Sequence, residues 1–349
     1  MTDFRVGRRA SSGVEPAWFP AAIPNVARWL TVDVLPPPTP EVPMDDREVP
    51  SEPAAEHAEA VPEQAPTEEA PTAVAAAEEA EVHHLHPPRR PLPRTIAVAN
   101  QKGGVGKTTT AVNLGAALAE LGFRVLVIDL DPQGNATTGL GINARNLHHS
   151  IYDVLMSDTP MEDCIEPTAL RNLFVAPATI DLAGAEIELV PAFSRELRLR
   201  RALERLGTDY DFVLIDCPPS LGLLTINGLA AVSEVLVPIQ CEYYALEGLG
   251  QLMRNITLVQ NNLNPRLELS TIVLTMYDAR TKLSEQVVRE VRTHFGAKVC
   301  RNIVPRTVRL SEAPSFGQPI LIFDSTSRGA IAYRELAKEV SDGAARRTG

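Results

Sequence analysis

The sequence predicts a doubly wound α/β domain, in which helices cover both faces of a mostly parallel sheet, preceded by an extension with no packed core. Three observations support this prediction. From Thr95 onward, short apolar runs alternate with longer amphipathic stretches. The strand-like runs are apolar throughout, which is typical of strands buried on both faces. The first 94 residues hold 17 of the 29 prolines, and so dense a set of prolines leaves few stretches able to complete a helix or strand.

Charge and composition place the domain boundary at residue 94. The whole chain has 33 basic and 44 acidic residues, a formal net charge of −11. Residues 1–94 carry 16 acids, 8 arginines and no lysine, which leaves 25 bases and 28 acids in residues 95–349. A Pro/Glu/Ala-rich, self-repelling segment is typical of a disordered linker. We therefore expect a disordered extension over residues 1–94 and one folded domain over residues 95–349.

The expected elements follow from these patterns in order. The run TIAVAN at 95–100 predicts a strand, and the amphipathic stretch at 108–121 predicts the helix after it. Further apolar runs of strand length predict strands at 124–129, 212–216, 234–240, 269–276 and 299–304. Apolar residues at helical spacing predict helices at 245–263, 282–295 and 328–340. Ligands of such a sheet lie outside the carboxyl ends of its strands.

The sequence argues against secretion, membrane insertion and metal clusters. No apolar run follows the arginines of residues 1–10, as a secretory signal would require. The longest uncharged run, 217–233, is too short and too polar to span a membrane. Four widely separated cysteines suit reduced thiols in a core: Cys164, Cys217, Cys241 and Cys300. Three histidines of the extension lack a partner at metal-binding spacing and are interpreted as solvated linker: His83, His84 and His86.

The strongest functional signal is QKGGVGKTT at residues 101–109, between the first predicted strand and the first predicted helix. A phosphate-binding loop requires this context. Its three glycines let the backbone curl so that successive N–H groups point into one concavity, and the helix N-terminus adds a positive dipole end. We expect ATP contacts from eight residues of this segment: Lys102, Gly103, Gly104, Val105, Gly106, Lys107, Thr108 and Thr109.

The side chains of this loop have distinct expected roles. Lys107 is placed to bridge β- and γ-phosphate oxygens, and the Thr108 hydroxyl to complete the coordination shell of Mg²⁺. Thr109 is expected at the α-phosphate. The loop departs from the ordinary Walker pattern, because Gln101 stands where glycine is usual and Lys102 adds a second cation. A second lysine at this position marks the deviant Walker A group.

Four motifs carry a resemblance to a known family: KGGVGKTTT at 102–110, DLDPQGNAT at 129–137, DCPPS at 216–220 and PRTVRLSEAPS at 305–315. In this order and spacing they resemble ParA/Soj DNA-partitioning ATPases. The resemblance covers about residues 94–340. It implies a P-loop NTPase fold, ATP and Mg²⁺ as cofactors, and ATP hydrolysis that is weak alone and stimulated by a partner.

The resemblance also implies roles for single residues. Lys102 would reach the nucleotide of a second subunit, so that ATP joins two copies in a sandwich dimer; a second fixed cation beside one triphosphate suits that role. Asp131 would position the attacking water, while Asp129 is expected to be structural or to lie behind the Mg²⁺ ligands. Asp216, at the end of an apolar strand, would hold a Mg²⁺-bound water. The predicted catalytic residues are thus Lys102, Lys107 and Asp131.

A basic segment lies near the C-terminal end. Between Arg280 and Arg309 there are eight bases and two acids, a local charge of +6 that acts within a Debye length of about 8 to 10 Å. A solvated helix face with ordinary loop arginines would also explain it. By resemblance, Arg280, Arg306 and Arg309 match positions that contact the DNA backbone. No helix-turn-helix is evident, so we expect phosphate contacts without base readout.

These observations favour a cytoplasmic, nucleoid-associated ATPase for chromosome segregation. Its ATP-bound homodimer would bind double-stranded DNA non-specifically, and a ParB-like centromere-binding protein would stimulate hydrolysis and release it. One alternative is a MinD-like membrane-cycling ATPase, which requires a C-terminal amphipathic anchor; residues 335–349 offer only Leu336 and Val340 as large apolar groups. Another is a nitrogenase-reductase-like carrier of an iron–sulfur cluster, which requires clustered thiolates.

The extension contains one unusual segment, residues 16–34, which holds both tryptophans of the chain, Trp18 and Trp29. Apolar groups at i, i+3 and i+4 there form one face of a short helix begun after a proline: Val26, Trp29 and Leu30. Such a helix is too short to be stable alone. It is predicted to dock on a polar or scaffold protein, with packing against the ATPase body, or no role, as the open alternative.

Overall fold

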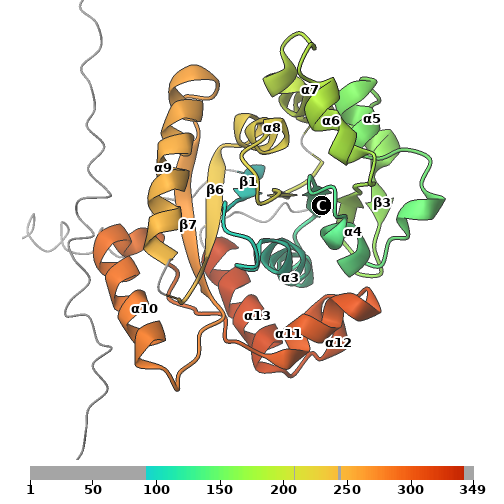
Figure 1. Cartoon of the computed structure of the whole chain (residues 1–349). Helices are drawn as coiled ribbons and strands as arrows, with labels where there is room; N and C mark the ends of the chain where they lie inside the picture. The colour runs from blue at the N-terminus through green and yellow to red at the C-terminus, as the bar shows by residue number, and fades with distance from the viewer. Residues whose placement is uncertain (1–91, 208, 243–244, 342–349) are drawn as a thin grey trace, which may run out of the picture.

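The computed structural model describes residues 92–207, 209–242 and 245–341. They form a central sheet between two layers of helices (Figure 1). The strand order is β3-β4-β2-β5-β1-β6-β7, and every neighbouring pair is parallel except β3 with β4. The strands are β1 (Arg94–Val98), β2 (Val125–Asp129), β3 (Glu166–Pro167), β4 (Leu173–Ala176), β5 (Phe212–Asp216), β6 (Glu234–Gln240) and β7 (Glu268–Thr275). The predicted doubly wound, mostly parallel α/β fold is therefore confirmed.

The helices bury two separate apolar cores, one on each face of the sheet. Along β1, Ala97 points to one core, and Ile96 and Val98 point to the other. One face is covered by α5 (Ile151–Met156), α6 (Leu182–Glu188), α7 (Arg198–Leu206), α8 (Leu223–Ala231), α9 (Ala245–Asn262) and α10 (Lys282–Phe295). The other is covered by α3 (Lys107–Glu120), α4 (Asn135–Gly139), α11 (Val308–Glu312), α12 (Ile320–Phe323) and α13 (Arg328–Ser341). This burial on both faces explains why the strands lack polar alternation.

The predicted strand at 299–304 is wrong. Only two isolated bridges form there, from Val299 to Ile272 and from Pro305 to Tyr277. Between them, the backbone N–H groups of Arg301 and Asn302 donate to the carboxylate of Glu339 on α13, at 2.7 and 3.2 Å. A side chain thus takes the donors that a continuous ladder with β7 would need.

Four cysteines lie buried as free thiols in the described part of the chain, as predicted: Cys164, Cys217, Cys241 and Cys300. No helix among the described residues combines the length and apolarity needed to cross a bilayer. The extension over residues 1–91, with its tryptophan segment, lies outside the described residues, so the predicted disorder there stays a prediction.

A buried arginine, Arg94, connects the two ends of the described chain. Arg94, at the start of β1, donates from Nε and Nη2 to the carboxylate of Glu234, both at 2.7 Å. Its Nη1 donates to the carbonyl of Val340 near the end of α13. Arg94 therefore belongs to the folded domain, which begins at least one residue before the predicted start at Thr95.

Candidate functional site

The site lies where β1, β2 and β5 end. In register, Asp129 at the end of β2 stands opposite Asp216 at the end of β5, and Val98 of β1 stands opposite Asp216 on the other side. The segment 99–106 leaves β1 at this edge and leads into α3. Three parallel strands therefore bring the predicted loop and two of the predicted carboxylates together, as the carboxyl edge of such a sheet does.

The loop is fastened to the sheet by two side chains that the sequence motif does not include. Asn100 donates from Nδ2 to the carbonyl of Pro238 at 2.8 Å, and its Oδ1 accepts the N–H of Lys102 at 3.0 Å. Thr275, the last residue of β7, donates its hydroxyl to the carbonyl of Val105 at 2.8 Å. These bonds hold the loop in its curled shape before any ligand arrives.

The curl depends on two glycines with left-handed backbone. Gly104 has φ 73°, and Gly106 has φ 88° and forms the N-cap of α3. These values favour glycine because a side chain would be strained there. Gly106 and the α3 N-terminus point free N–H groups at the same space, which suits an anion.

Lys107 is buried at the first position of α3, and its Nζ donates to the carbonyl of Lys102 at 3.4 Å. Burial lowers the pKa of Lys107, while the nearby Asp216, Cys217 and Asp131 oppose the decrease. A buried ammonium that reaches only one long hydrogen bond has donors to spare for phosphate oxygens.

Asp216 is the most exceptional group of the site. Its side chain is fully buried, and neither carboxylate oxygen has a hydrogen-bond partner among the described residues. Burial, and next the neighbouring Asp129, raise the pKa of Asp216 well above its usual value, and the nearby Thr108 hydroxyl and Lys107 only partly oppose them. A buried carboxylate without partners is costly, so the position suits a group that pairs with a bound cation or its water ligands.

The two acids after β2 differ in their surroundings. Asp129 is fully buried and accepts three hydrogen bonds, from the Asp131 N–H at 3.1 Å and from the Thr137 N–H and hydroxyl at 2.8 and 2.7 Å. Burial raises the pKa of Asp129 to about 6, against the effect of those bonds. Asp131 is buried beside it, and one of its oxygens accepts the N–H of Gln133 at 3.0 Å. Asp129 thus fixes the start of α4, which agrees with its predicted structural role.

Lys102 does not point into its own loop. Its Nζ lies 3.7 Å from a carboxylate oxygen of Glu242, which follows β6, and about a third of its side chain is exposed. Within one chain the second lysine therefore pairs with a carboxylate at the rim of the site. Glu242 could not be predicted from the sequence, because nothing in the spacing links it to the loop.

The comparisons with known proteins decide the family. A sequence profile described as an AAA domain matches residues 93–269. The sporulation initiation inhibitor protein Soj of Bacillus subtilis is 58% identical over 248 residues, which cover 71% of this chain and 98% of Soj. The chromosome partitioning protein ParA of Caulobacter vibrioides is 57% identical over 249 residues, which cover 71% of this chain and 93% of ParA. The chain belongs to the ParA/Soj family.

Solved structures support the fold. Cobyrinic acid a,c-diamide synthase from Mycobacterium smegmatis with ADP and magnesium is 45% identical, with a TM-score of 0.62 over 71% of this chain and 93% of that protein. MinD from Pyrococcus horikoshii with Mg-ADP is 26% identical, with a TM-score of 0.58 over 71% and 95%. The ParA/Soj-family domain described here therefore has the P-loop NTPase fold that was predicted.

Beside the loop of this ParA/Soj-family chain lies a cavity of about 290 Å³. Its walls come from the loop, the end of β7, segment 304–314 and α13: Gly106, Thr109, Thr275, Met276, Val304, Pro305, Arg306, Thr307, Leu310, Ser311, Pro314 and Tyr333. Met276 has φ 52°, a strained value for a side-chain-bearing residue and typical of functional sites. Six of these residues belong to the motif at 305–315, but sequence reasoning did not place that motif beside the loop, because Thr275, Met276 and Tyr333 join it only in the fold.

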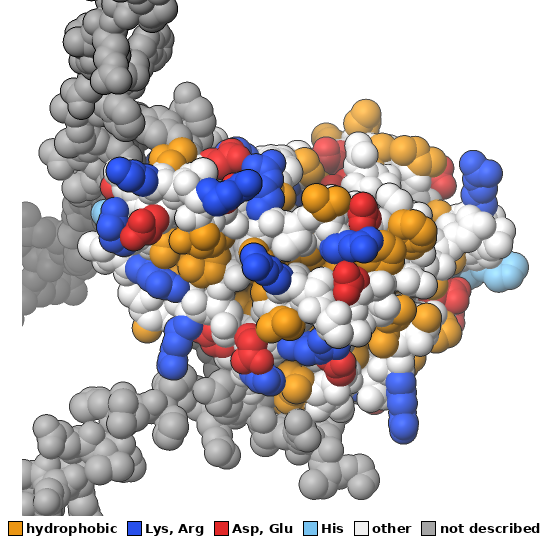
Figure 2. Space-filling view, turned by 90° about the horizontal axis from the view of Figure 1, so that it is seen from below, with side chains coloured by type: hydrophobic (Ala, Val, Ile, Leu, Met, Phe, Trp, Pro, Cys, Tyr) orange, Lys and Arg blue, Asp and Glu red, His pale blue; other side chains and the backbone are white. Residues whose placement is uncertain are grey.

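The three arginines predicted for DNA lie on neighbouring segments. The Arg306 N–H donates to the carbonyl of Tyr277 at 3.0 Å, which brings the loop of Arg280 beside that of Arg306. Figure 2, which views the side of α10 to α13, shows Lys and Arg side chains spread over this face among acidic and apolar ones. Positive charge is therefore present but interrupted.

Two of these arginines already have carboxylate partners. Arg280 is bidentate on Asp278, at 2.9 and 2.7 Å, with 88% of its side chain exposed. Arg309 lies 3.1 Å from Glu312 and 3.3 Å from Asp324. Arg306 is exposed and forms no ion pair with the described residues. This neutralisation could not be seen in the count of bases against acids.

Proposed function

We propose that this chain is a DNA-partitioning ATPase that binds ATP with Mg²⁺, dimerises around the nucleotide and, in that state, binds DNA non-specifically. One observation carries the proposal: Asp216 is a fully buried carboxyl with no hydrogen-bond partner among the described residues, next to Lys107 and the curled loop. Such a carboxyl beside a buried ammonium that makes one long hydrogen bond suits a ligand that brings both phosphate and a divalent cation.

The residues of the loop fit that ligand. Backbone N–H groups of residues 103–109 and the Lys107 ammonium would hold the phosphates, with Thr109 nearest the α-phosphate. The Thr108 hydroxyl and, through a water, Asp216 would hold Mg²⁺, which when bound neutralises charge on the β- and γ-phosphates. The cavity beside Gly106 and Thr109 is roomy enough for the base of the nucleotide.

Hydrolysis is assigned to Asp131. Its carboxylate is buried at the same edge as Lys107 and would orient the attacking water. A carboxylate orients water without supplying the positive charge that stabilises the transition state. Turnover by the chain alone is therefore slow, and a ParB-like centromere-binding partner is proposed to raise it.

Lys102 is proposed to act across the dimer, on the nucleotide of the partner subunit. In one chain it is held only by Glu242 at 3.7 Å, at the exposed rim of the site. Exposed ion pairs of this kind contribute at most about 1 kcal/mol, so the triphosphate of a second copy competes easily for the ammonium. Dimer formation would then depend on ATP.

DNA binding is assigned to Arg280, Arg306 and Arg309, with Arg306 contributing most because, unlike the other two, it forms no ion pair among the described residues. Contacts to phosphates without base readout would make the binding non-specific. Release would follow hydrolysis and loss of the dimer. A nucleoid-associated protein of the cytoplasm is the proposed location.

Light scattering of purified protein with and without ATP and Mg²⁺ tests the proposal. Wild type should double in mass with ATP. Lys107→Ala should lose nucleotide binding, whereas Lys102→Ala should bind ATP and stay monomeric. Lys338→Ala on α13, which removes an exposed lysine paired with Glu335, is the matched control and should dimerise. ATP-dependent dimers of Lys102→Ala would contradict the role across the interface.

A further inference from the structure

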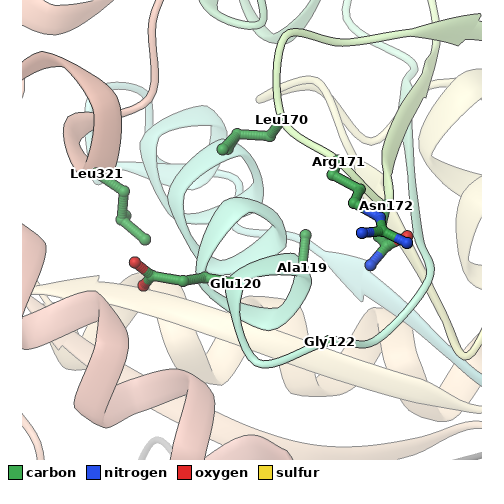
Figure 3. Close-up of a pocket in the computed structure, with 7 residues that line it drawn as sticks. All are labelled: Ala119, Glu120, Gly122, Leu170, Arg171, Asn172 and Leu321. Carbon is green, nitrogen blue, oxygen red and sulfur yellow. The ribbon is translucent and has the colours of Figure 1, made fainter.

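A second cavity lies at the opposite end of α3 from the phosphate loop (Figure 3). It measures about 340 Å³. Since α3 has 14 residues, the cavity is roughly 20 Å from the loop along the helix axis. It is lined by Ala119, Glu120, Gly122, Leu170, Arg171, Asn172 and Leu321. None of these residues has a role in the site described above.

The walls of this cavity combine apolar and positive groups. Leu170 packs on the apolar core beneath α3, to which Ala119 and Leu321 belong through their buried side chains. Glu120 at the rim is already occupied, because Arg334 donates to its two oxygens at 2.7 and 3.0 Å. Arg171 is exposed and forms no ion pair with the described residues. An apolar group with acidic neighbours would suit this opening.

The chain itself enters the fold close to this cavity. Leu92, the first described residue, packs on the same apolar core as Leu170 and Leu121. β1 is separated from β2, the strand that follows α3, by β5 alone, a distance of about 10 Å at the usual strand spacing. Whatever precedes residue 92 therefore starts at the edge of the domain that holds the cavity.

The extension supplies a matching occupant. Trp18 and Trp29 are the two tryptophans of the whole chain, both within residues 16–34. The segment itself holds one acid and one arginine, Asp33 and Arg28, while the linker at residues 35–91 holds 13 acids and 3 arginines, so that the linker rather than the segment complements Arg171. Those 57 residues could span up to roughly 190 Å, so length does not limit contact.

We propose that residues 16–34 dock on the domain of the same chain, with Trp29 in the cavity between Leu170 and Leu321. Docking within one chain requires little intrinsic affinity, because a tether of this kind gives an effective concentration on the order of millimolar. The burial of one indole ring adds a large apolar contact area with few rotatable bonds. The extension would then be held at the edge of the domain remote from the phosphate loop.

Tryptophan fluorescence of the full chain tests this proposal directly, because the domain contains no tryptophan. In Trp18→Phe, Trp29 is the one remaining indole. We expect its emission to be blue-shifted and its quenching by acrylamide to be several-fold weaker than in urea. Leu170→Asp in this background should shift the emission to the red and restore quenching. Leu258→Asp on α9, at an apolar side chain that is 60% exposed, is the matched control and should change neither.

Circular dichroism and ATP binding, read for all three proteins, report whether each variant folds. The proposal would be overturned if acrylamide quenched Trp29 as strongly in the folded protein as in urea. It would also be overturned if Leu170→Asp left Trp29 protected from quenching. Arg171→Glu offers a second, exposed change and should also raise quenching. Protection should not vary with protein concentration; protection that grows with concentration would show a second copy as the occupant and overturn docking within one chain.

Discussion

Without nucleotide, Asp216→Asn should gain stability relative to the wild type as the pH rises. Asp216 is fully buried and has no hydrogen-bond partner in the described part of the chain, and its pKa is raised chiefly by burial. A carboxyl whose folded pKa exceeds its unfolded value binds its proton more tightly in the folded state. The folded state therefore loses about 1.4 kcal/mol per pH unit for each such group, from the unfolded pKa up to the folded one.

The structure defines the pH window. Asp129 has its pKa raised from 3.8 to about 6, and Asp216 well above 3.8. Between pH 4.5 and 6, Asp129 alone should cost the wild type and Asp216→Asn about 2 kcal/mol each. Asp216 adds to this loss in the wild type only, because its pKa is also raised by burial. The difference in free energy of unfolding should therefore grow in favour of the variant over this window.

Urea denaturation of both proteins at pH 4.5, 5.25 and 6 without nucleotide measures this difference. With saturating ATP and Mg²⁺ at pH 7, the wild type should instead be more stable than Asp216→Asn. The ligand stabilises the wild type by mass action, whereas the variant has lost part of the Mg²⁺ site. Parallel stability curves for wild type and Asp216→Asn across the window would refute the claim that this carboxylate is buried at a cost until a ligand arrives.

Three further predictions concern turnover, DNA and the extension. Asp131→Ala should bind ATP, dimerise and stay on DNA while phosphate release falls to background, since only water positioning is lost; rapid phosphate release would assign the catalytic acid elsewhere. Arg306→Glu should flatten the plot of log K against log salt by roughly 0.9, with Arg205→Glu on α7 as the control, and an unchanged slope would move the DNA face. Removal of residues 1–91 should leave ATPase and DNA binding near wild type, because the cavity proposed for residues 16–34 lies roughly 20 Å from the phosphate loop along α3, and loss of either activity would contradict that placement. The deletion stops before Arg94, because that residue holds β1 to Glu234.

Much of the fold could be predicted, because its central strands are buried on both faces and flanked by long amphipathic helices. The strands at 212–216 and 234–240 and the helix at 282–295 have the predicted bounds. The region 130–211 gave no prediction, since its elements are short and its strands β3 and β4 have two and four residues. No continuous strand forms at 299–304, because the side chain of Glu339, remote in sequence, accepts backbone N–H groups of this segment.

The candidate site likewise has residues that the sequence predicts and residues that only the fold reveals. Loop residues and the acids at strand ends follow local motifs, so the sequence located them. Asn100 and Thr275, which fasten the loop, and Glu242, which pairs with Lys102, come from segments that only the folded sheet brings together. The count of bases near the C-terminal end likewise missed that Asp278 neutralises Arg280.

The central claim is that nucleotide state controls DNA binding, and retention on DNA measures it most directly. Wild-type protein should sediment with long double-stranded DNA in the presence of ATP and Mg²⁺ and stay in solution with ADP or no nucleotide. Lys102→Ala should stay in solution under all three conditions, because it lacks the cation that joins two copies. Equal retention of wild type with ATP, with ADP and without nucleotide would contradict the account.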